Sequence, residues 1–188
     1  MMDSNTSYNR QNIPRLTAHD AVRQRPGMYI GGADARALHH LVYEILDHMV
    51  EEAFVGRCDH IELTLLPENR VVIRDNSHGL PMSPYKDSGL TKMEAILVNL
   101  AAHKRDFEPE LYAVTGGIHG MGLTVVNMLS AEMVVENARD GFLWRQVYRE
   151  GLAQSSLEQI RPLDETEHGT TFSFVPDFTL LHLSKNLM

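Results

Sequence analysis

The chain is poor in cysteine and has no long apolar run. Cys58 is its only cysteine among 188 residues, which excludes an internal disulfide and a zinc site built from several cysteines. No apolar stretch approaches the ~20 residues that a membrane-spanning helix needs, and the polar N-terminus is unlike a secretory signal. These absences are typical of a protein of a reducing, aqueous compartment, so we expect it in the cytoplasm and away from membranes.

Basic residues are also scarce. The chain holds only four lysines, and 17 Lys and Arg residues stand against 25 Asp and Glu residues, for a net charge of −8. This balance argues against a main DNA-binding surface, which is normally basic. It does not exclude an assembly whose other parts hold DNA. The length and the 43% hydrophobic content fit one domain with a core.

Apolar periodicity predicts helices over residues 18–24, 34–55 and 92–102. The long middle helix has Asp34 as its expected N-cap and Gly56 just past its end. Beside its apolar stripe, polar residues recur in steps of four. We leave two interpretations of this stripe open: a solvated face, or a site into which two of its members project together. The polar stripe consists of His40, Glu44, His48 and Glu52.

Short apolar runs predict strands over residues 61–66, 71–74, 133–137, 142–148 and 170–175, the first two joined as a hairpin. Residues 103–115 lack periodicity and predict a long loop. The order of elements predicts an α+β fold, a two-layer sandwich of helices on a mixed, mostly antiparallel sheet. We expect an N-terminal arm over residues 1–17, one domain over residues 18–177 and a tail over residues 178–188.

Two loops carry the chemistry. Asp75 ends a buried strand, and Gly79 lets the backbone turn tightly. A buried carboxylate there accepts a hydrogen bond from an exocyclic amine, although an ordinary Asx turn is the alternative. The second loop, residues 115–122, is glycine-rich and leads into a helix, an arrangement that suits phosphate. It is not a Walker A loop, because no Gly-Lys-Ser/Thr follows.

Four pieces stand in a fixed order: a helix bearing Glu44, a strand that ends in Asp75-x-x-x-Gly79, a glycine loop with His119, and a late strand that opens with Gly169-Thr170. Local motifs accompany them at residues 20–31, 38–44, 116–122 and 125–127. Together they resemble the GHKL ATPase family, and within it the N-terminal ATPase domain of type IIA topoisomerase B subunits, those of gyrase and topoisomerase IV. The resemblance covers about residues 8–177. It implies the Bergerat ATP-binding fold, ATP and magnesium as ligands, and ATP-driven dimer closure that serves DNA strand passage.

The resemblance also implies roles for individual residues. Glu44 would be the general base that activates the attacking water. Asp75 would accept the adenine amino group, assisted by Gly79 and Thr170. Tyr8, in the arm, would reach the second subunit of a homodimer. Apolar walls around the base would come from Leu80, Pro81 and Ile96, and the triphosphate would be wrapped by Gly117, His119, Gly120 and Gly122.

The chain departs from the family pattern at several points. His48 stands where the family has its magnesium-binding asparagine, and magnesium prefers hard oxygen ligands. Ser77 and His78 replace a glycine and an arginine of the Asp-x-Gly-x-Gly motif, so that a Glu52–His78 pair is expected in place of a Glu–Arg pair. The glycine pair that usually opens the lid is His103-Lys104.

The family's Gln-Thr-Lys loop, whose lysine reaches the terminal phosphate, does not occur here. The chain is therefore expected to be a domain of a longer subunit or a free-standing relative, with DNA held only by other domains or a partner subunit. A nucleotide-binding pseudo-ATPase that serves dimerisation or regulation is the main alternative. A transition-metal site on His40, Glu44 and His48 is a further one. A histidine kinase is disfavoured, because no coiled-coil heptads precede the domain.

Overall fold

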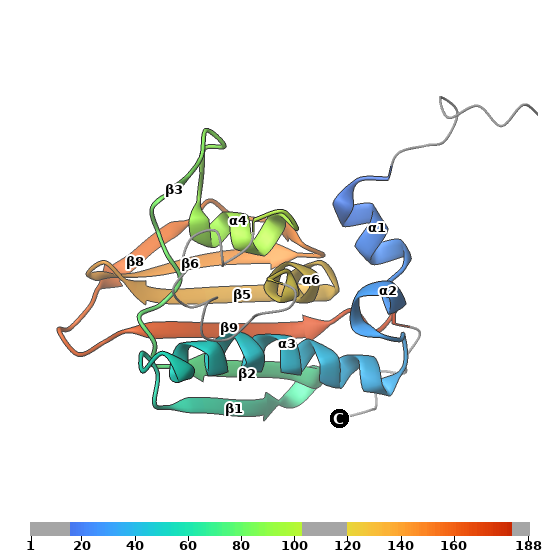
Figure 1. Cartoon of the computed structure of the whole chain (residues 1–188), viewed down its shortest axis with the longest axis horizontal. Helices are drawn as coiled ribbons and strands as arrows, with labels where there is room; N and C mark the ends of the chain where they lie inside the picture. The colour runs from blue at the N-terminus through green and yellow to red at the C-terminus, as the bar shows by residue number, and fades with distance from the viewer. Residues whose placement is uncertain (1–15, 103–119, 182–188) are drawn as a thin grey trace, which may run out of the picture.

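The main sheet has seven strands and carries helices on one face (Figure 1). The structure is a computed structural model, and it describes residues 16–102 and 120–181. Every strand pair within those residues is antiparallel. Along the sheet the order is β1-β2-β9-β5-β6-β7, and β8 pairs with β6. The predicted α+β, two-layer architecture is confirmed.

The elements have the following bounds. The main sheet consists of β1 (Ile61–Leu66), β2 (Arg70–Asp75), β5 (Ser130–Arg139), β6 (Phe142–Arg149), β7 (Leu152–Ala153), β8 (Glu158–Pro162) and β9 (Gly169–Pro176). A two-stranded ribbon is formed by β3 (Pro84–Tyr85) and β4 (Leu90–Thr91), and a 3-10 turn, η2 (Pro67–Asn69), joins β1 to β2. The helices are α1 (Ala18–Gln24), α2 (Gly27–Ile30), α3 (Ala35–Phe54), α4 (Lys92–Val98) and α6 (Gly122–Met128).

Helix α3 begins and ends where its sequence predicts. The Asp34 carboxylate accepts hydrogen bonds from the backbone N–H groups of Arg36 and Ala37, which satisfies donors that a helix start leaves free. Gly56 follows the last turn with φ of 74°, a conformation that costs glycine little. The helix runs across the face of β2 and β9 (Figure 1), and its apolar stripe is buried in the core.

Helix α4 ends at Val98, four residues before the predicted end at residue 102. Asn99 leaves helical geometry with φ of −125° and ψ of 109°. Two side chains of α6 accompany this end: the Thr124 hydroxyl donates to the Ile96 carbonyl and the Asn127 amide to the Leu97 carbonyl, at 2.9 Å for the latter. Tertiary hydrogen bonds thus replace a further helical turn. The sequence patterns also did not predict the short elements α2, β3, β4, β7 and β8.

The core lies between the helices and the inner face of the sheet. Phe172 and Phe174 of β9 are fully buried, and β9 pairs with both β2 and β5. Phe178 and Leu181, which the sequence placed in a tail, are buried in the same core. The core therefore extends to Leu181, beyond the predicted boundary at residue 177. Within residues 16–102 and 120–181, no helix has the length and apolar character needed to cross a membrane.

Arg23 fastens α1 to the end of the sheet. Its guanidinium lies 2.9 Å from the Asp177 carboxylate and 3.2 Å from that of Glu150, and it donates to the Met128 carbonyl at 2.8 Å. Arg23 and Asp177 are largely buried, with 16% and 11% of their side-chain surface exposed. The planar guanidinium therefore joins three segments that are distant in sequence.

We expect Arg23→Met to lower the free energy of unfolding by about 2 kcal/mol, because it leaves the buried Asp177 carboxylate without its partner. Urea unfolding measures this change. Arg149→Met is the matched control: Arg149 pairs with Glu132 at 3.7 Å but is 65% exposed, so its loss should cost less than about 1 kcal/mol. Equal effects of the two substitutions would contradict the role given to Arg23.

Candidate functional site

The end of β2 carries a buried carboxylate. Asp75 is 1% exposed. Its Oδ1 atom accepts hydrogen bonds from the Ser77 N–H at 3.0 Å, the Ser77 hydroxyl at 2.9 Å and the Thr170 N–H at 2.8 Å. Its Oδ2 atom is equally buried, yet it has no hydrogen-bond partner among the described residues. One oxygen is thus anchored by the protein, while the other is left for a donor from outside.

Burial raises the pKa of the Asp75 carboxyl above its ordinary value. The hydrogen bonds from Thr170 and Ser77 favour the carboxylate and oppose this shift, whereas the negative charge of Glu52 adds to it. The net direction is upward because desolvation penalises the charged form most. The raised pKa means that ionisation of Asp75 costs the folded protein stability, and such perturbed groups are typical of binding sites.

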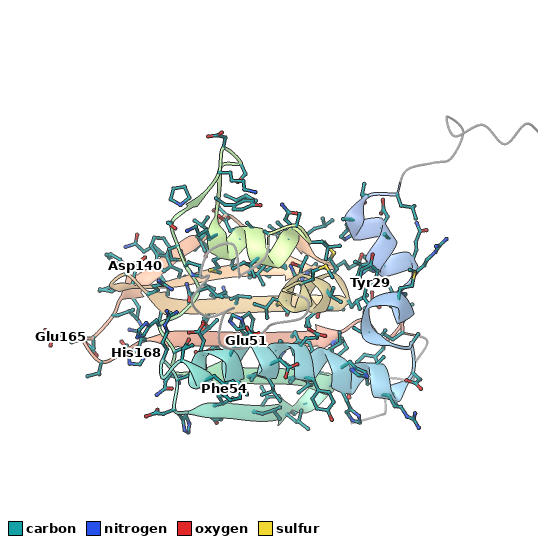
Figure 2. The ribbon with its side chains drawn as sticks, viewed as in Figure 1. Tyr29, Glu51, Phe54, Asp140, Glu165 and His168 are labelled. Atoms are coloured by element: carbon teal, nitrogen blue, oxygen red, sulfur yellow. The ribbon has the colours of Figure 1, made fainter. Side chains whose placement is uncertain are left out.

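Strand β9 reaches Asp75 closely because it begins with a glycine. Gly169 has φ of 121°, and a Cβ atom there would overlap the backbone oxygen of Asp75. The preceding His168 places its ring Nδ1 2.9 Å from the Ser77 carbonyl oxygen. His168 lies at the same end of the sheet as Asp140 and Glu165 (Figure 2). The close contact between Gly169 and the Asp75 backbone brings the Thr170 N–H to the Asp75 carboxylate.

The turn after Asp75 is held by β5. Gly79 has φ of 73°. The Leu80 N–H donates to Asn137 Oδ1 at 2.8 Å, and Asn137 Nδ2 donates to the Leu80 carbonyl at 2.9 Å. Arg139 donates to the Gly79 carbonyl. Sequence reasoning missed both Asn137 and Arg139. The available signal for Asn137 was an amide in line with Met133 on an otherwise apolar strand face.

The apolar residues predicted for the site come together. Leu80 and Ile96 are each 2% exposed and belong to one core cluster. Pro81 is buried, and its carbonyl accepts a hydrogen bond from the Met93 N–H of α4 at 2.9 Å. The turn is therefore attached to α4, the helix that carries Ile96. Leu80, Pro81 and Ile96 are thus joined in one part of the core by the turn and α4.

Glu44 packs against the start of α6. A Cβ atom on Gly122 would overlap the Glu44 carboxylate and lie 3.1 Å from the Glu44 Cβ. Glycine at this position thus lets α3 and α6 approach with the carboxylate between them. Gly120 has φ of 58°. The predicted site residues Gly117, His119 and Tyr8 lie outside the described residues, as do His103 and Lys104.

His48 does not suit the role of a magnesium ligand. It is 9% exposed, and its ring packs edge-on against Phe172, with 6.1 Å between the ring centroids. An imidazole nitrogen in this setting does not provide the hard oxygen that magnesium requires. Among the described residues, no group of three or more His, Cys, Asp or Glu side chains is placed to hold a metal ion. The alternative of a transition-metal site on His40, Glu44 and His48 is therefore unsupported.

The expected partner of Glu52 is also different. Glu52 is buried, and its carboxylate lies 3.8 Å from the Arg57 guanidinium. His78, expected to pair with Glu52, is exposed. The structure thus provides Glu52 with a cation from the segment that follows α3.

Comparison with known proteins decides the family. Residues 33–180 match the model of the histidine kinase-, DNA gyrase B-, and HSP90-like ATPase family. The chain belongs to this ATPase family. It is 42% identical over 175 residues to the B subunit of DNA gyrase from Streptomyces coelicolor, which covers 93% of this chain and 25% of that protein. It is 40% identical over 177 residues to the corresponding gyrase protein of Clostridium acetobutylicum, with 94% and 27% covered.

A solved member of the ATPase family has the same architecture. The 43K ATPase domain of Thermus thermophilus gyrase B, crystallised with an aminocoumarin, superposes with a TM-score of 0.76 at 31% identity. The match covers 88% of this chain and 41% of that one. The predicted resemblance to the gyrase B ATPase domain and its fold is confirmed, and nothing in these comparisons supports the pseudo-ATPase alternative. The chain spans about a quarter of the length of the curated relatives it matches.

We expect Asp75→Asn to raise the free energy of unfolding at neutral pH by about 1 kcal/mol, because it removes a buried charge from the site of this ATPase family member. The amide oxygen still accepts the bonds made to Oδ1. Since the folded-state pKa of Asp75 is raised, its protonation favours folding, and that contribution is lost as the pH rises through this pKa. The gain in the variant should therefore grow with pH.

Urea unfolding between about pH 4 and pH 8 measures this difference. Asp140→Asn is the control, because the Asp140 side chain is 64% exposed and its replacement should change the free energy of unfolding by less than about 0.5 kcal/mol. A variant less stable than the parent at neutral pH would show that the Asp75 charge stabilises the fold.

Proposed function

We propose that this chain binds ATP, with the adenine base seated on Asp75. The observation that carries the proposal is the buried Oδ2 atom without a hydrogen-bond partner among the described residues. Adenine presents an exocyclic amine, which donates to such an oxygen. Guanine presents a carbonyl oxygen at the corresponding position, and two acceptors would repel each other. Leu80, Pro81 and Ile96 form the apolar surroundings, and Gly79 and Thr170 complete the base site.

We propose Glu44 as the general base of ATP hydrolysis. A carboxylate acts in this way when it lies within reach of the attacking water. Gly122 places the start of α6 directly against Glu44. The backbone that would bind the triphosphate is therefore adjacent to the carboxylate that would activate water. Gly117, His119, Gly120 and Gly122 are the proposed phosphate-binding residues. Supporting this assignment, glycine at position 122 is required by the approach to Glu44.

Magnesium, in this proposal, enters with the phosphates of ATP. His48 is not suited to hold it as a resident ion, and we route no catalytic step through the metal. The family membership supports the use of ATP, for which magnesium is the usual companion.

We further propose that the chain forms a homodimer through its N-terminal arm, residues 1–17, with Tyr8 reaching the nucleotide of the second subunit. ATP binding would close this dimer and serve DNA strand passage in a larger assembly, as in a type IIA topoisomerase. The net charge of −8 supports DNA contact through other domains or a partner subunit. The cytoplasm is the proposed location.

The test is calorimetric titration of the chain with a non-hydrolysable ATP analogue and, separately, with the GTP analogue. We expect the ATP analogue to bind and the GTP analogue to bind at least about tenfold more weakly. Asp75→Asn should weaken ATP-analogue binding by at least about 100-fold, because it replaces the acceptor by a donor and leaves a buried polar group unpaired.

Asp87→Asn is the control, since Asp87 is exposed and lies in the turn between β3 and β4. Undiminished affinity of Asp75→Asn would show that the base does not sit on Asp75. Absence of binding by the parent chain would contradict the proposed function as a whole.

We expect His48→Asn to increase the dependence of binding on magnesium, because it restores the amide oxygen that the family resemblance implies at this position, and magnesium prefers oxygen to imidazole. The readout is the ratio of the ATP-analogue dissociation constants with and without magnesium, which should change by about tenfold. His40→Asn, on the same helix but exposed, should leave the ratio unchanged. An unchanged ratio in His48→Asn as well would mean that position 48 does not limit magnesium use.

A further inference from the structure

We propose that Asn137 is the positioning residue of the base site, and that it fixes the turn from Asp75 to Leu80 in the conformation that receives adenine. This inference rests on the proposed function and adds a residue to it. Three features of Asn137 support it: its place in β5, the two groups to which it binds, and its close fit to Gly79.

Asn137 is a polar residue in an apolar position. It is fully buried, and along β5 it shares its sheet face with Met133 and Val135, which are also fully buried. It lies opposite Thr170 in the β5–β9 register. A buried amide is costly unless its oxygen and nitrogen are both hydrogen-bonded. Its presence on this face therefore calls for specific partners.

The two shortest hydrogen bonds of the Asn137 amide both go to Leu80, and its nitrogen also donates to the Met82 sulfur at 3.2 Å. The side-chain oxygen accepts from the Leu80 N–H at 2.8 Å, and the nitrogen donates to the Leu80 carbonyl at 2.9 Å. This is the exchange of two hydrogen bonds that a residue makes with its partner in an antiparallel ladder. Asn137 thus gives the turn a strand-like partner where the backbone itself has none, and Leu80 is held in position and orientation.

The fit to Gly79 shows that the two positions depend on each other. A Cβ atom on Gly79 would lie 2.5 Å from Asn137 Oδ1. At the start of the turn, the Ser77 hydroxyl binds Asp75 Oδ1 and accepts from the Gly79 N–H at 3.2 Å. The turn is therefore fixed at Ser77 on one side and by Asn137 on the other. This fixes the direction in which Asp75 Oδ2 points.

The Thr170 hydroxyl joins the same arrangement. It lies 3.4 Å from Asn137 Oδ1, to which it donates, and its own oxygen can still accept a hydrogen bond. Asn137 thus reaches Leu80 and Thr170, two residues assigned to the base site, without being proposed to touch the base itself. A turn held in its bound conformation before the ligand arrives loses less conformational entropy on binding.

The experiment compares Asn137→Leu and Asn137→Ala with the parent chain. Leu matches the size of Asn but makes no hydrogen bond, and Ala avoids overpacking if Leu prevents folding. Met133→Ala is the control for general loss of stability, because Met133 is a buried residue on the same face of the same strand and does not contact the turn through any of the bonds described here.

Two measurements are made on each variant. Hydrogen exchange of the Leu80 amide should accelerate by at least about tenfold in both Asn137 variants relative to the Ile73 amide, because Leu80 loses its acceptor. Affinities for ADP and for the ATP analogue should both fall by about tenfold, the effect of roughly 1.4 kcal/mol. The two losses should be equal, since the turn serves the base and not the terminal phosphate. Met133→Ala should change neither readout by more than about twofold.

If Leu80 exchange or nucleotide affinity in the Asn137 variants matched the parent, or if Met133→Ala reproduced both effects, Asn137 would be a core residue only and the inference would be overturned. If the parent chain bound neither nucleotide, the proposed function would fail and this inference with it. Binding by the parent with unaltered binding by the Asn137 variants would overturn the inference alone.

Discussion

The buried carboxylate of Asp75, shared between a strand end and the start of β9, is the constraint on which the site depends. Its Oδ1 atom is bound by Ser77 and by the Thr170 N–H, which fastens β2, the following turn and β9 to one another. Because these bonds all fall on one oxygen, the other remains buried and without a partner in the described residues. A buried carboxylate oxygen without a hydrogen-bond donor lowers the stability of the folded protein. Retaining it is the physical basis of nucleotide recognition in our proposal.

Three glycines allow neighbouring segments to pack closely around the Asp75 and Glu44 carboxylates. Gly169 lets β9 reach Asp75, Gly79 admits the Asn137 amide, and Gly122 brings α6 against Glu44. At each of these positions an added methyl group would meet backbone or a polar side chain of the site. The site therefore depends on close packing between the sheet and the helices. Within it, the Asn137 side chain binds the backbone of Leu80 as a neighbouring strand would.

Much of this was accessible from the sequence. The caps of α3, the Asp75-to-Gly79 turn and the apolar run of β9 are local patterns, and each was predicted within one or two residues. The end of α4 was not, because side chains of α6 bind its last carbonyls. Strands β7 and β8 were missed because they are short and exposed, so they lack the apolar alternation that marks a half-buried strand.

By itself the sequence determined the family and the α+β class, and it singled out Glu44 and Asp75 as candidate site residues. It could do so because the order of the motifs and the apolar periodicity are properties of the linear chain. The tertiary structure alone decided which oxygen of Asp75 has no partner among residues 16–102 and 120–181. It also decided that Glu52 lies by Arg57, that His48 packs on Phe172, and that Asn137 binds Leu80. The His48–Phe172 and Asn137–Leu80 pairs join residues distant in sequence, with Asn137 and Leu80 57 positions apart. Such contacts follow from sheet register and helix packing, which no local pattern contains.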